Sequence, residues 1–240
     1  MWLLIDAGNT RVKWAFHDGE QWLGRGSADH AALDGLAVQW AALPTPRRVV
    51  GCNVAGPEVK ATMERLALIW RLPVDWLTPS GSRLGVRNGY ADPPQLGADR
   101  WAALLAAHSL HEGNCLVVNV GTAMTVDALA ASGQHLGGII APGFRLMQQA
   151  LAGGTADLGS RSGSFTPFPG NTADAIHGGI MQALIGGVSR MAGEMKLSGC
   201  PVSVCVLSGG DAHLLRPYLN LKVLLVENLV LEGLLRVVKE

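Results

Sequence analysis

The stretch LLIDAGNTRVKWAFHDGE, residues 3–20, decides the expected fold. A short apolar run leads to Asp6 and into the small residues of DAGNT, and a second apolar pattern follows at once. In this second pattern Val12, Trp14 and Phe16 occupy alternate positions, which is the period of a half-buried strand. The stretch therefore predicts two strands joined by a turn of small and polar residues.

The turn after Asp6 points to phosphate chemistry. A Gly-rich turn exposes backbone N–H groups that can hold phosphate oxygens. In P-loop and dinucleotide folds a helix follows such a turn, whereas here a strand follows, so neither motif applies. A carboxylate repels phosphate, but Asp6 could hold a hydrated Mg²⁺ that bridges the phosphates. The alternative is a plain β-turn in which Asp6 and Asn9 bond their own backbone, and the hairpin alone leaves both possibilities open.

A second copy of this plan begins halfway along the chain. LVVNVGTAMTVDALAASGQHLGGII, residues 116–140, again runs strand, small turn, strand, turn, strand. Three positions of the first turn have counterparts in the second, pairing Asp6 with Asn119, Gly8 with Gly121 and Asn9 with Thr122. We therefore expect an α/β protein of two similar halves, residues 1–113 and 114–240, with a ligand cleft between them.

The rest of the chain shows strand and helix patterns in alternation. Helices are expected at 31–43, 58–70 and 97–113, from Thr172 to about Lys196, and at 228–240. Loops rich in Gly, Pro and polar residues are expected at 80–95 and 153–170. In the long helix, Gly178-Gly179 and Gly186-Gly187 are eight residues apart and should share a face, which indicates close approach of a second helix or of a second subunit.

The composition narrows the class of protein. The 19 basic and 19 acidic residues balance, so no basic excess favours nucleic-acid binding. The four cysteines form no CxxC pair and lie in apolar runs, which is typical of free thiols in a reducing compartment. No apolar run approaches the ~20 residues of a membrane span, and Asp6 interrupts the first one too early for a signal peptide. We expect a cytoplasmic protein that binds neither nucleic acid nor membrane.

A second polar motif, GYADPPQLGADRW at residues 89–101, contains a candidate catalytic carboxylate. Asp99 falls in the first turn of an expected helix, where an acidic residue commonly caps the helix. It could instead act as a general base toward a substrate hydroxyl, and the adjacent Arg100 could bind a carboxylate. Spacing alone leaves both roles open.

Taken together, these motifs resemble those of the type III pantothenate kinases. The matching segments are DAGNT at 6–10, GYADPPQLGADRW at 89–101, VGTAMTVD with GGIIAPG at 120–143, GNTADAIHGGI at 170–180 and LSGGDAHLL at 207–215. The family belongs to the actin, hexokinase and Hsp70 superfamily. The resemblance therefore implies two RNase H-like halves with mixed sheets around a nucleotide cleft.

The same resemblance implies ATP- and Mg²⁺-dependent phosphorylation of pantothenate, the first step toward coenzyme A, by a homodimer with composite active sites. Asp99 is similar to the family's proton acceptor. The implied ATP-binding residues are Asp6, Ala7, Gly8, Asn9, Thr10, Arg11, Val12, Lys13 and Thr122. The implied pantothenate-binding residues are Tyr90, Gly97, Ala98, Asp99, Arg100 and Thr172, the last from the neighbouring subunit.

One position departs from the family pattern. Many members have an acidic residue where this chain has Asn119, and that carboxylate binds a monovalent cation such as K⁺. Asn119 offers a carbonyl oxygen without a charge, so a requirement for K⁺ or NH₄⁺ is open. Two other functions also stay open, namely another small-molecule kinase of the superfamily and a non-catalytic accessory or transcription-associated protein of the same fold.

Overall fold

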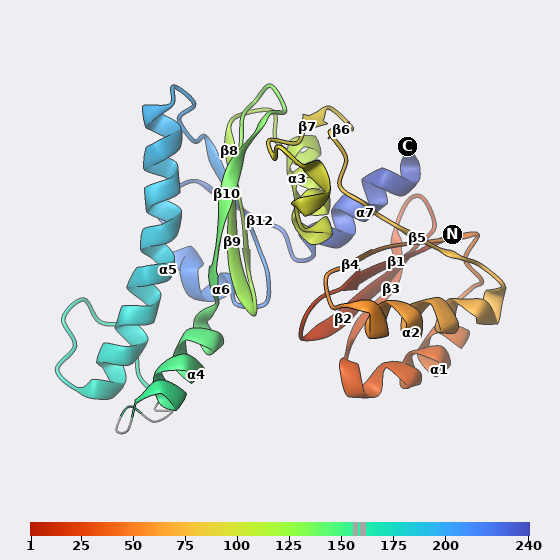
Figure 1. Cartoon of the computed structure of the whole chain (residues 1–240), viewed down its shortest axis with the longest axis horizontal. Helices are drawn as coiled ribbons and strands as arrows, with labels where there is room; N and C mark the ends of the chain where they lie inside the picture. Colours follow the sequence, from red (N-terminus) through yellow and green to blue (C-terminus); the bar gives the residue numbers. More distant parts are fainter. Residues whose placement is uncertain (156–157, 159–161) are drawn as a thin grey trace. The chain divides into compact units, whose positions relative to one another are not determined.

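The computed structural model describes residues 1–155, 158 and 162–240. Contacts divide the chain into two compact units, Met1–Leu110 with Asn228–Glu240, and His111–Glu227. Each unit contains a five-stranded mixed sheet with helices packed against it (Figure 1). The α/β class and the paired mixed sheets expected from the sequence are confirmed.

The first sheet has the strand order β3-β2-β1-β4-β5. Its strands are β1 (Trp2–Ala7), β2 (Arg11–His17), β3 (Trp22–Asp29), β4 (Arg48–Asn53) and β5 (Val74–Trp76). The first three strands are antiparallel neighbours, whereas β4 and β5 continue the sheet in parallel with β1. The alternating residues Trp14 and Phe16 point into one core cluster, where Trp14 meets Trp40 edge to face at 6.2 Å between ring centroids.

The helical segments of the first unit follow the expected pattern with local differences. They are η1 (His30–Gly35), α1 (Leu36–Ala41), α2 (Pro57–Ala67), η2 (Leu68–Trp70), η3 (Pro93–Gln95), α3 (Ala98–Leu110) and α7 (Leu229–Lys239). The helix expected at 31–43 is a 3₁₀ turn followed by a short α-helix, with the poor helix former Gly35 at the junction. The loop at 80–95 also contains a two-stranded hairpin of β6 (Ser82–Arg83) and β7 (Val86–Arg87).

The C-terminal helix α7 packs within the first unit, although the expected boundary at 113/114 had placed it in the second half. Most of its residues are buried, so it needs an apolar surface, and it finds one on α3 and β1. Gly233 lies directly on the backbone of Ala102 in α3, where any Cβ would overlap. A glycine is required here because the two helix backbones approach so closely.

The second sheet repeats the topology of the first, with the order β10-β9-β8-β11-β12. Its strands are β8 (Cys115–Val120), β9 (Ala123–Leu129), β10 (His135–Pro142), β11 (Val204–Ser208) and β12 (Val223–Leu225). Antiparallel and parallel pairs occur in the same places as in the first sheet. The internal repeat inferred from the two turn motifs is therefore confirmed, and only the short strand β12 was not expected.

Helices cover the second sheet as well. They are α4 (Phe144–Gly154), α5 (Thr172–Leu197), α6 (Ala212–Leu215) and the 3₁₀ turn η4 (Arg216–Tyr218). The long helix α5 runs along one face of the sheet (Figure 1), as expected, whereas α4 was not expected. Part of the loop expected at 153–170 lies outside the described residues.

The glycine pairs of α5 do not share a single face. Gly187 faces Met124 and Ile139 of the sheet, and Gly178 lies against the segment that contains Thr166 and Pro169. Gly179 and Gly186 are exposed and have open space above them. Only the outer glycine of each pair is therefore available to a partner.

Among the described residues, no helix has both the length and the apolar character that crossing a membrane requires.

Candidate active site

Asp6 lies near the end of β1, between partners on both neighbouring strands. It is in register with Lys13 on the antiparallel strand β2 and with Cys52 on the parallel strand β4. Residues in register point to the same face of a sheet. The Cys52 thiol donates a hydrogen bond to the carboxylate, with Sγ 3.6 Å from Oδ1. The turn thus begins with a carboxylate flanked by one cation and one neutral thiol.

Burial of the Asp6 carboxyl is the main cause that raises its pKa from 3.8 to about 6. The charge of Lys13 lowers the pKa and the charge of Asp99 raises it, so both groups are close enough to interact with Asp6. The same two carboxylates also raise the pKa of the buried Cys52 thiol, after burial itself. The first unit therefore brings Asp6, Lys13, Cys52 and Asp99 together, although Asp6 and Asp99 are far apart in the sequence.

The turn between β1 and β2 is held by one backbone hydrogen bond and one side-chain contact. The Gly8 N–H donates to the Arg11 carbonyl oxygen at 3.2 Å, and His30 Nε2 lies 2.9 Å from the Gly8 carbonyl oxygen. Asn9 and Thr10 at the tip are exposed. An exposed, fixed turn with a half-buried carboxylate before it suits a bound polyphosphate and its divalent cation.

Asp99 occupies the first turn of α3, as expected. Its Oδ1 accepts a hydrogen bond from the Arg100 N–H at 2.8 Å, and a Cβ at Gly97 would collide with the same oxygen at 2.6 Å. Arg100 is only 5% exposed, and its Nη1 donates to the Tyr90 hydroxyl at 2.9 Å. A buried guanidinium needs polar partners, and here the Tyr90 hydroxyl is one of them. The Arg100–Tyr90 pair could therefore bind a polar or anionic group of a ligand.

The loop that carries Tyr90 is fixed by Asn88. The Asn88 side chain accepts from the Tyr90 N–H at 3.0 Å and donates to the Pro93 carbonyl oxygen at 3.2 Å. These contacts hold a segment that has little regular secondary structure. The tyrosine is therefore held beside Arg100 by its own loop.

The turn of the second unit matches the first in position and register. Asn119 on β8 is in register with Thr125 on β9 and Ser208 on β11, as Asp6 is with Lys13 and Cys52. The Gly121 N–H donates to the Ala123 carbonyl oxygen at 3.0 Å, and Thr122 is exposed at the tip. In the second turn, the amide of Asn119 takes the place of the Asp6 carboxylate, and its neighbours in register carry hydroxyl groups instead of an amine and a thiol.

Two further glycine turns meet the Thr122 turn within the second unit. The Gly143 N–H donates to the Thr122 carbonyl oxygen at 2.8 Å, and the Asp211 N–H donates to the Val120 carbonyl oxygen at 3.1 Å. Gly209 has a φ of +103°, and a Cβ there would overlap the backbone of Val120. The SGG turn after β11 therefore lies against the end of β8, as closely packed backbone.

Thr172 is exposed at the start of α5, on a well-capped helix end. The side chain of Asn171 accepts from the Asp174 N–H at 3.0 Å. The Asp174 carboxylate in turn accepts from the Ser164 N–H at 2.8 Å, which ties the preceding segment to the helix. Hydrogen bonds from Ser164 and Asn171 hold the pKa of Asp174 below its usual value.

The described residues contain no group of three or more His, Cys, Asp or Glu side chains arranged to hold a metal ion. A divalent cation at Asp6 would therefore take most of its ligands from phosphate and water. This is the usual manner in which Mg²⁺ binds with nucleotides, and one desolvated carboxylate fits it.

The comparisons with known proteins identify the family. The family model of the type III pantothenate kinases matches residues 2–194. A type III pantothenate kinase of Aromatoleum aromaticum is 48% identical over 240 residues, which cover 100% of this chain and 98% of the relative. This chain belongs to the type III pantothenate kinase family.

Solved structures show the same fold at low sequence identity. A protein named as a 2-dehydro-3-deoxygalactonokinase from Sinorhizobium meliloti superposes with a TM-score of 0.66 at 16% identity, over 100% of this chain and 96% of that one. A protein named as a Baf family transcriptional activator from Campylobacter jejuni gives 0.64 at 20% identity, over 99% and 97%. These likenesses show a shared fold alone, since one fold hosts several functions.

In this member of the pantothenate kinase family, two residues at the first turn were not expected from the sequence. Cys52 was expected only as a free thiol in an apolar run, and the contact of His30 with Gly8 had no signal in the sequence. A lone histidine in a polar stretch carries no information about a carbonyl partner 22 residues earlier. The pairing of Cys52 with Asp6 depends on strand register, which a single sequence does not determine.

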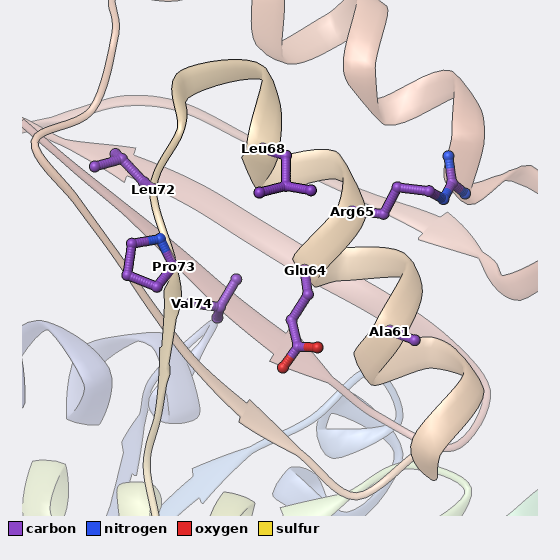
Figure 2. A pocket seen from close by; sticks show the side chains of 7 residues that line it. All are labelled: Ala61, Glu64, Arg65, Leu68, Leu72, Pro73 and Val74. Atoms are coloured by element: carbon purple, nitrogen blue, oxygen red, sulfur yellow. The ribbon is translucent and has the colours of Figure 1, made fainter.

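A surface pocket of about 450 Å³ lies elsewhere in the first unit (Figure 2). It is lined by Ala61, Glu64, Arg65, Leu68, Leu72, Pro73 and Val74, none of them a predicted site residue. Its glutamate accepts a hydrogen bond from Trp76, and its arginine turns away to pair with Asp34. The polar groups at the rim are therefore already engaged, and we assign no role to this pocket in the kinase reaction.

Proposed function

We propose that this chain transfers the γ-phosphate of ATP to the primary hydroxyl of pantothenate, giving 4'-phosphopantothenate, the first step of coenzyme A biosynthesis. Family membership supports the activity. The structural observation that carries it is the placement of two carboxylates in the first unit, with Asp6 beside Cys52 before the first turn and Asp99 at the start of α3. One suits the cation that accompanies ATP, and the other suits the substrate hydroxyl.

In this proposal, residues Asp6 to Lys13 form the ATP phosphate site. The exposed turn offers backbone N–H groups, and Lys13 adds a positive charge in register with Asp6. Asp6 would hold Mg²⁺, which neutralises negative charge on the phosphates when it is bound. Thr122, on the matching turn of the second unit, is the proposed further contact to ATP.

Asp99 is the proposed general base. As the bond between the pantothenate oxygen and the γ-phosphorus forms, the hydroxyl proton passes to the Asp99 carboxylate and ADP leaves. The Arg100 N–H holds Oδ1 of this carboxylate, so the group is oriented before substrate arrives. Holding the two reactants in line supplies much of the rate in phosphoryl transfer.

The proposed pantothenate site consists of Tyr90, Gly97, Ala98, Asp99 and Arg100, with Thr172 of the partner subunit. The buried Arg100–Tyr90 pair supplies a fixed positive charge, which suits a substrate that carries a carboxylate. A homodimer is part of this proposal, and the exposed glycines Gly179 and Gly186 on α5 support it because they allow close approach of a second copy.

We propose that activity depends on a monovalent cation less strongly than it would with an acidic residue at position 119, because Asn119 can offer only a neutral carbonyl oxygen to K⁺ or NH₄⁺.

We also propose that the protein is cytoplasmic. All four cysteines are free, as a reducing compartment allows.

A coupled assay of ADP release tests the function. The expected result is ATP- and Mg²⁺-dependent release of ADP with pantothenate, and none above background with glucose, glycerol or acetate as acceptor. Running the assay with and without K⁺ tests the cation. Turnover of another acceptor but not of pantothenate would refute the proposal in favour of another small-molecule kinase. Inactivity toward every acceptor, with nucleic-acid retention in a gel shift at physiological salt, would refute it in favour of a transcription-associated role.

A further inference from the structure

We propose that His30 is a positioning residue of the phosphate turn, holding the Gly8 carbonyl so that the Asn9 N–H is aimed at the phosphates of ATP. The inference rests on the proposed function, since it assumes that this turn binds ATP. It adds a residue that neither the motif nor the family resemblance assigns to the site.

The contact joins two segments that are otherwise separate in the sequence. His30 is the first residue of η1, directly after β3, and its Nε2 lies 2.9 Å from the carbonyl oxygen of Gly8. A carbonyl oxygen can only accept, so Nε2 carries the hydrogen and donates it. Both the neutral Nε2–H tautomer and the charged imidazolium make this bond, and its presence does not depend on protonation of the ring.

Peptide geometry transmits the contact to the next residue. The Gly8 carbonyl and the Asn9 N–H belong to one planar trans peptide group, in which the two bonds point in opposite directions. Because the carbonyl points to His30, the Asn9 N–H points away from His30. A carbonyl that accepts a hydrogen bond also polarises its peptide group, which makes the N–H a better donor.

The Asn9 N–H is a donor of this turn that is available to a ligand. The Gly8 N–H is already bonded to the Arg11 carbonyl oxygen at 3.2 Å. Within the part of the chain that the structure describes, the Asn9 N–H has no hydrogen-bond partner, and Asn9 is exposed. An exposed donor held in one direction is what an anionic oxygen requires.

The site around His30 also allows an informative substitution. The ring lines an open pocket of about 320 Å³ together with Leu33, Ala55 and the start of α2, so it is not enclosed on all sides. Glutamine places an N–H donor at a similar reach to Nε2, whereas alanine removes the donor. Comparing His30→Gln with His30→Ala therefore shows whether the effect comes from the hydrogen bond to Gly8 or from the imidazole ring itself.

The test measures ATP affinity by titration calorimetry without pantothenate, together with the KM for pantothenate and the melting temperature. We expect His30→Ala to weaken ATP binding about fivefold, the effect of losing one hydrogen bond, with the KM for pantothenate unchanged. We expect His30→Gln to bind ATP within about twofold of the wild type. His111→Ala is the matched control, because it removes a histidine whose Nε2 lies 2.7 Å from Ser203 Oγ in the second unit.

Unchanged ATP affinity in His30→Ala would overturn the proposal. So would an equal loss of ATP affinity in the alanine and glutamine variants accompanied by a lower melting temperature, since that pattern belongs to a residue that only stabilises the fold. A wild-type protein that does not bind ATP would instead refute the proposed function itself, before any variant is compared.

Discussion

Asp6 and Cys52 lie side by side on the parallel strands β1 and β4, and the thiol donates to the carboxylate across a distance of 3.6 Å. Burial raises the pKa of Cys52 well above its usual value, with further contributions from the charges of Asp6 and Asp99. Cys52 therefore remains a neutral thiol that offers a weak donor and no charge. Lys13 lowers the pKa of Asp6, but burial raises it by more, so the net pKa stays high. A metal ion bound to this carboxylate would therefore stabilise its charged form.

The cost of removing the Asp6 carboxylate from water should make the free energy of unfolding depend on pH. The pKa of Asp6 is about 6 in the folded protein, above its value of 3.8 in the unfolded chain, so the folded state binds more protons between these values. Stability is therefore lost as the pH rises through this window, by up to about 3 kcal/mol. We expect Asp6→Asn to raise the melting temperature near pH 8, without nucleotide or Mg²⁺, and to change it little near pH 4.

Melting curves at several pH values check this expectation. The exposed Asp92→Asn is the control and should show no pH-dependent gain. A gain of the same size at low and high pH in Asp6→Asn would contradict burial of the charge as its cause. The same variant should need more Mg²⁺ for activity, and an unchanged Mg²⁺ titration would remove Asp6 from the metal site.

Asp99→Asn tests the general base. Asparagine retains the oxygen that accepts from the Arg100 N–H, so the start of α3 and the ATP affinity should be preserved. Turnover should fall by at least about a hundredfold, because asparagine cannot take the hydroxyl proton. Steady-state kinetics with a parallel measurement of ATP binding checks both parts, and turnover near the wild-type rate would exclude Asp99 as the base.

Asn119→Asp tests the proposed monovalent-cation site. A carboxylate at this position adds the charge that the amide lacks, so K⁺ should stimulate the variant more than it stimulates the wild type. Activity measured against K⁺ concentration, with Na⁺ keeping the ionic strength constant, checks this outcome. Identical K⁺ curves for the two proteins would show that residue 119 does not contact the cation.

The buried pair of Asp127 and His135 should contribute to the stability of the second unit. His135 Nε2 lies 2.9 Å from Asp127 Oδ1, and both side chains are almost fully buried across β9 and β10. Asp127→Ala leaves a buried imidazole without this acceptor and should lower stability by about 3 kcal/mol. The exposed pair Arg48–Asp75 provides the control, since Asp75→Ala should cost less than about 1 kcal/mol. Equal losses in chemical denaturation would contradict the role of burial.

Packing of the C-terminal helix on α3 gives a last prediction. A side chain at Gly233 would overlap the backbone of Ala102, so Gly233→Val should destabilise the first unit by about 3 kcal/mol or more. Gly193→Ala in α5 is the control, because open space surrounds that position and alanine favours a helix. Thermal melts compare the two, and a neutral Gly233→Val would mean that the helices do not approach this closely.

Much of the candidate site could be predicted from the sequence because its signals are local. The alternation around Trp14, the small turn after Asp6 and the position of Asp99 in the first turn of an apolar helix each lie within a few residues. The matching turn at Gly121 extended this pattern to the second half, and the two sheets do share one topology. Helix α4 was not expected although residues 144–152 are mostly good helix formers; its last two residues, Gly153 and Gly154, fall in the stretch that was expected as a loop, and the helix packs against α5.

The sequence by itself determined the α/β class, the repeated hairpins, the polar turns and the family, because periodicity, turn composition and motifs are carried by neighbouring residues. Only the tertiary structure decided which distant residues meet. It set the register that places Cys52 beside Asp6, brought His30 to the Gly8 carbonyl, and packed the C-terminal helix on α3. These contacts depend on strand pairing and on the burial of apolar faces, which involve the whole chain and leave no mark at any single position.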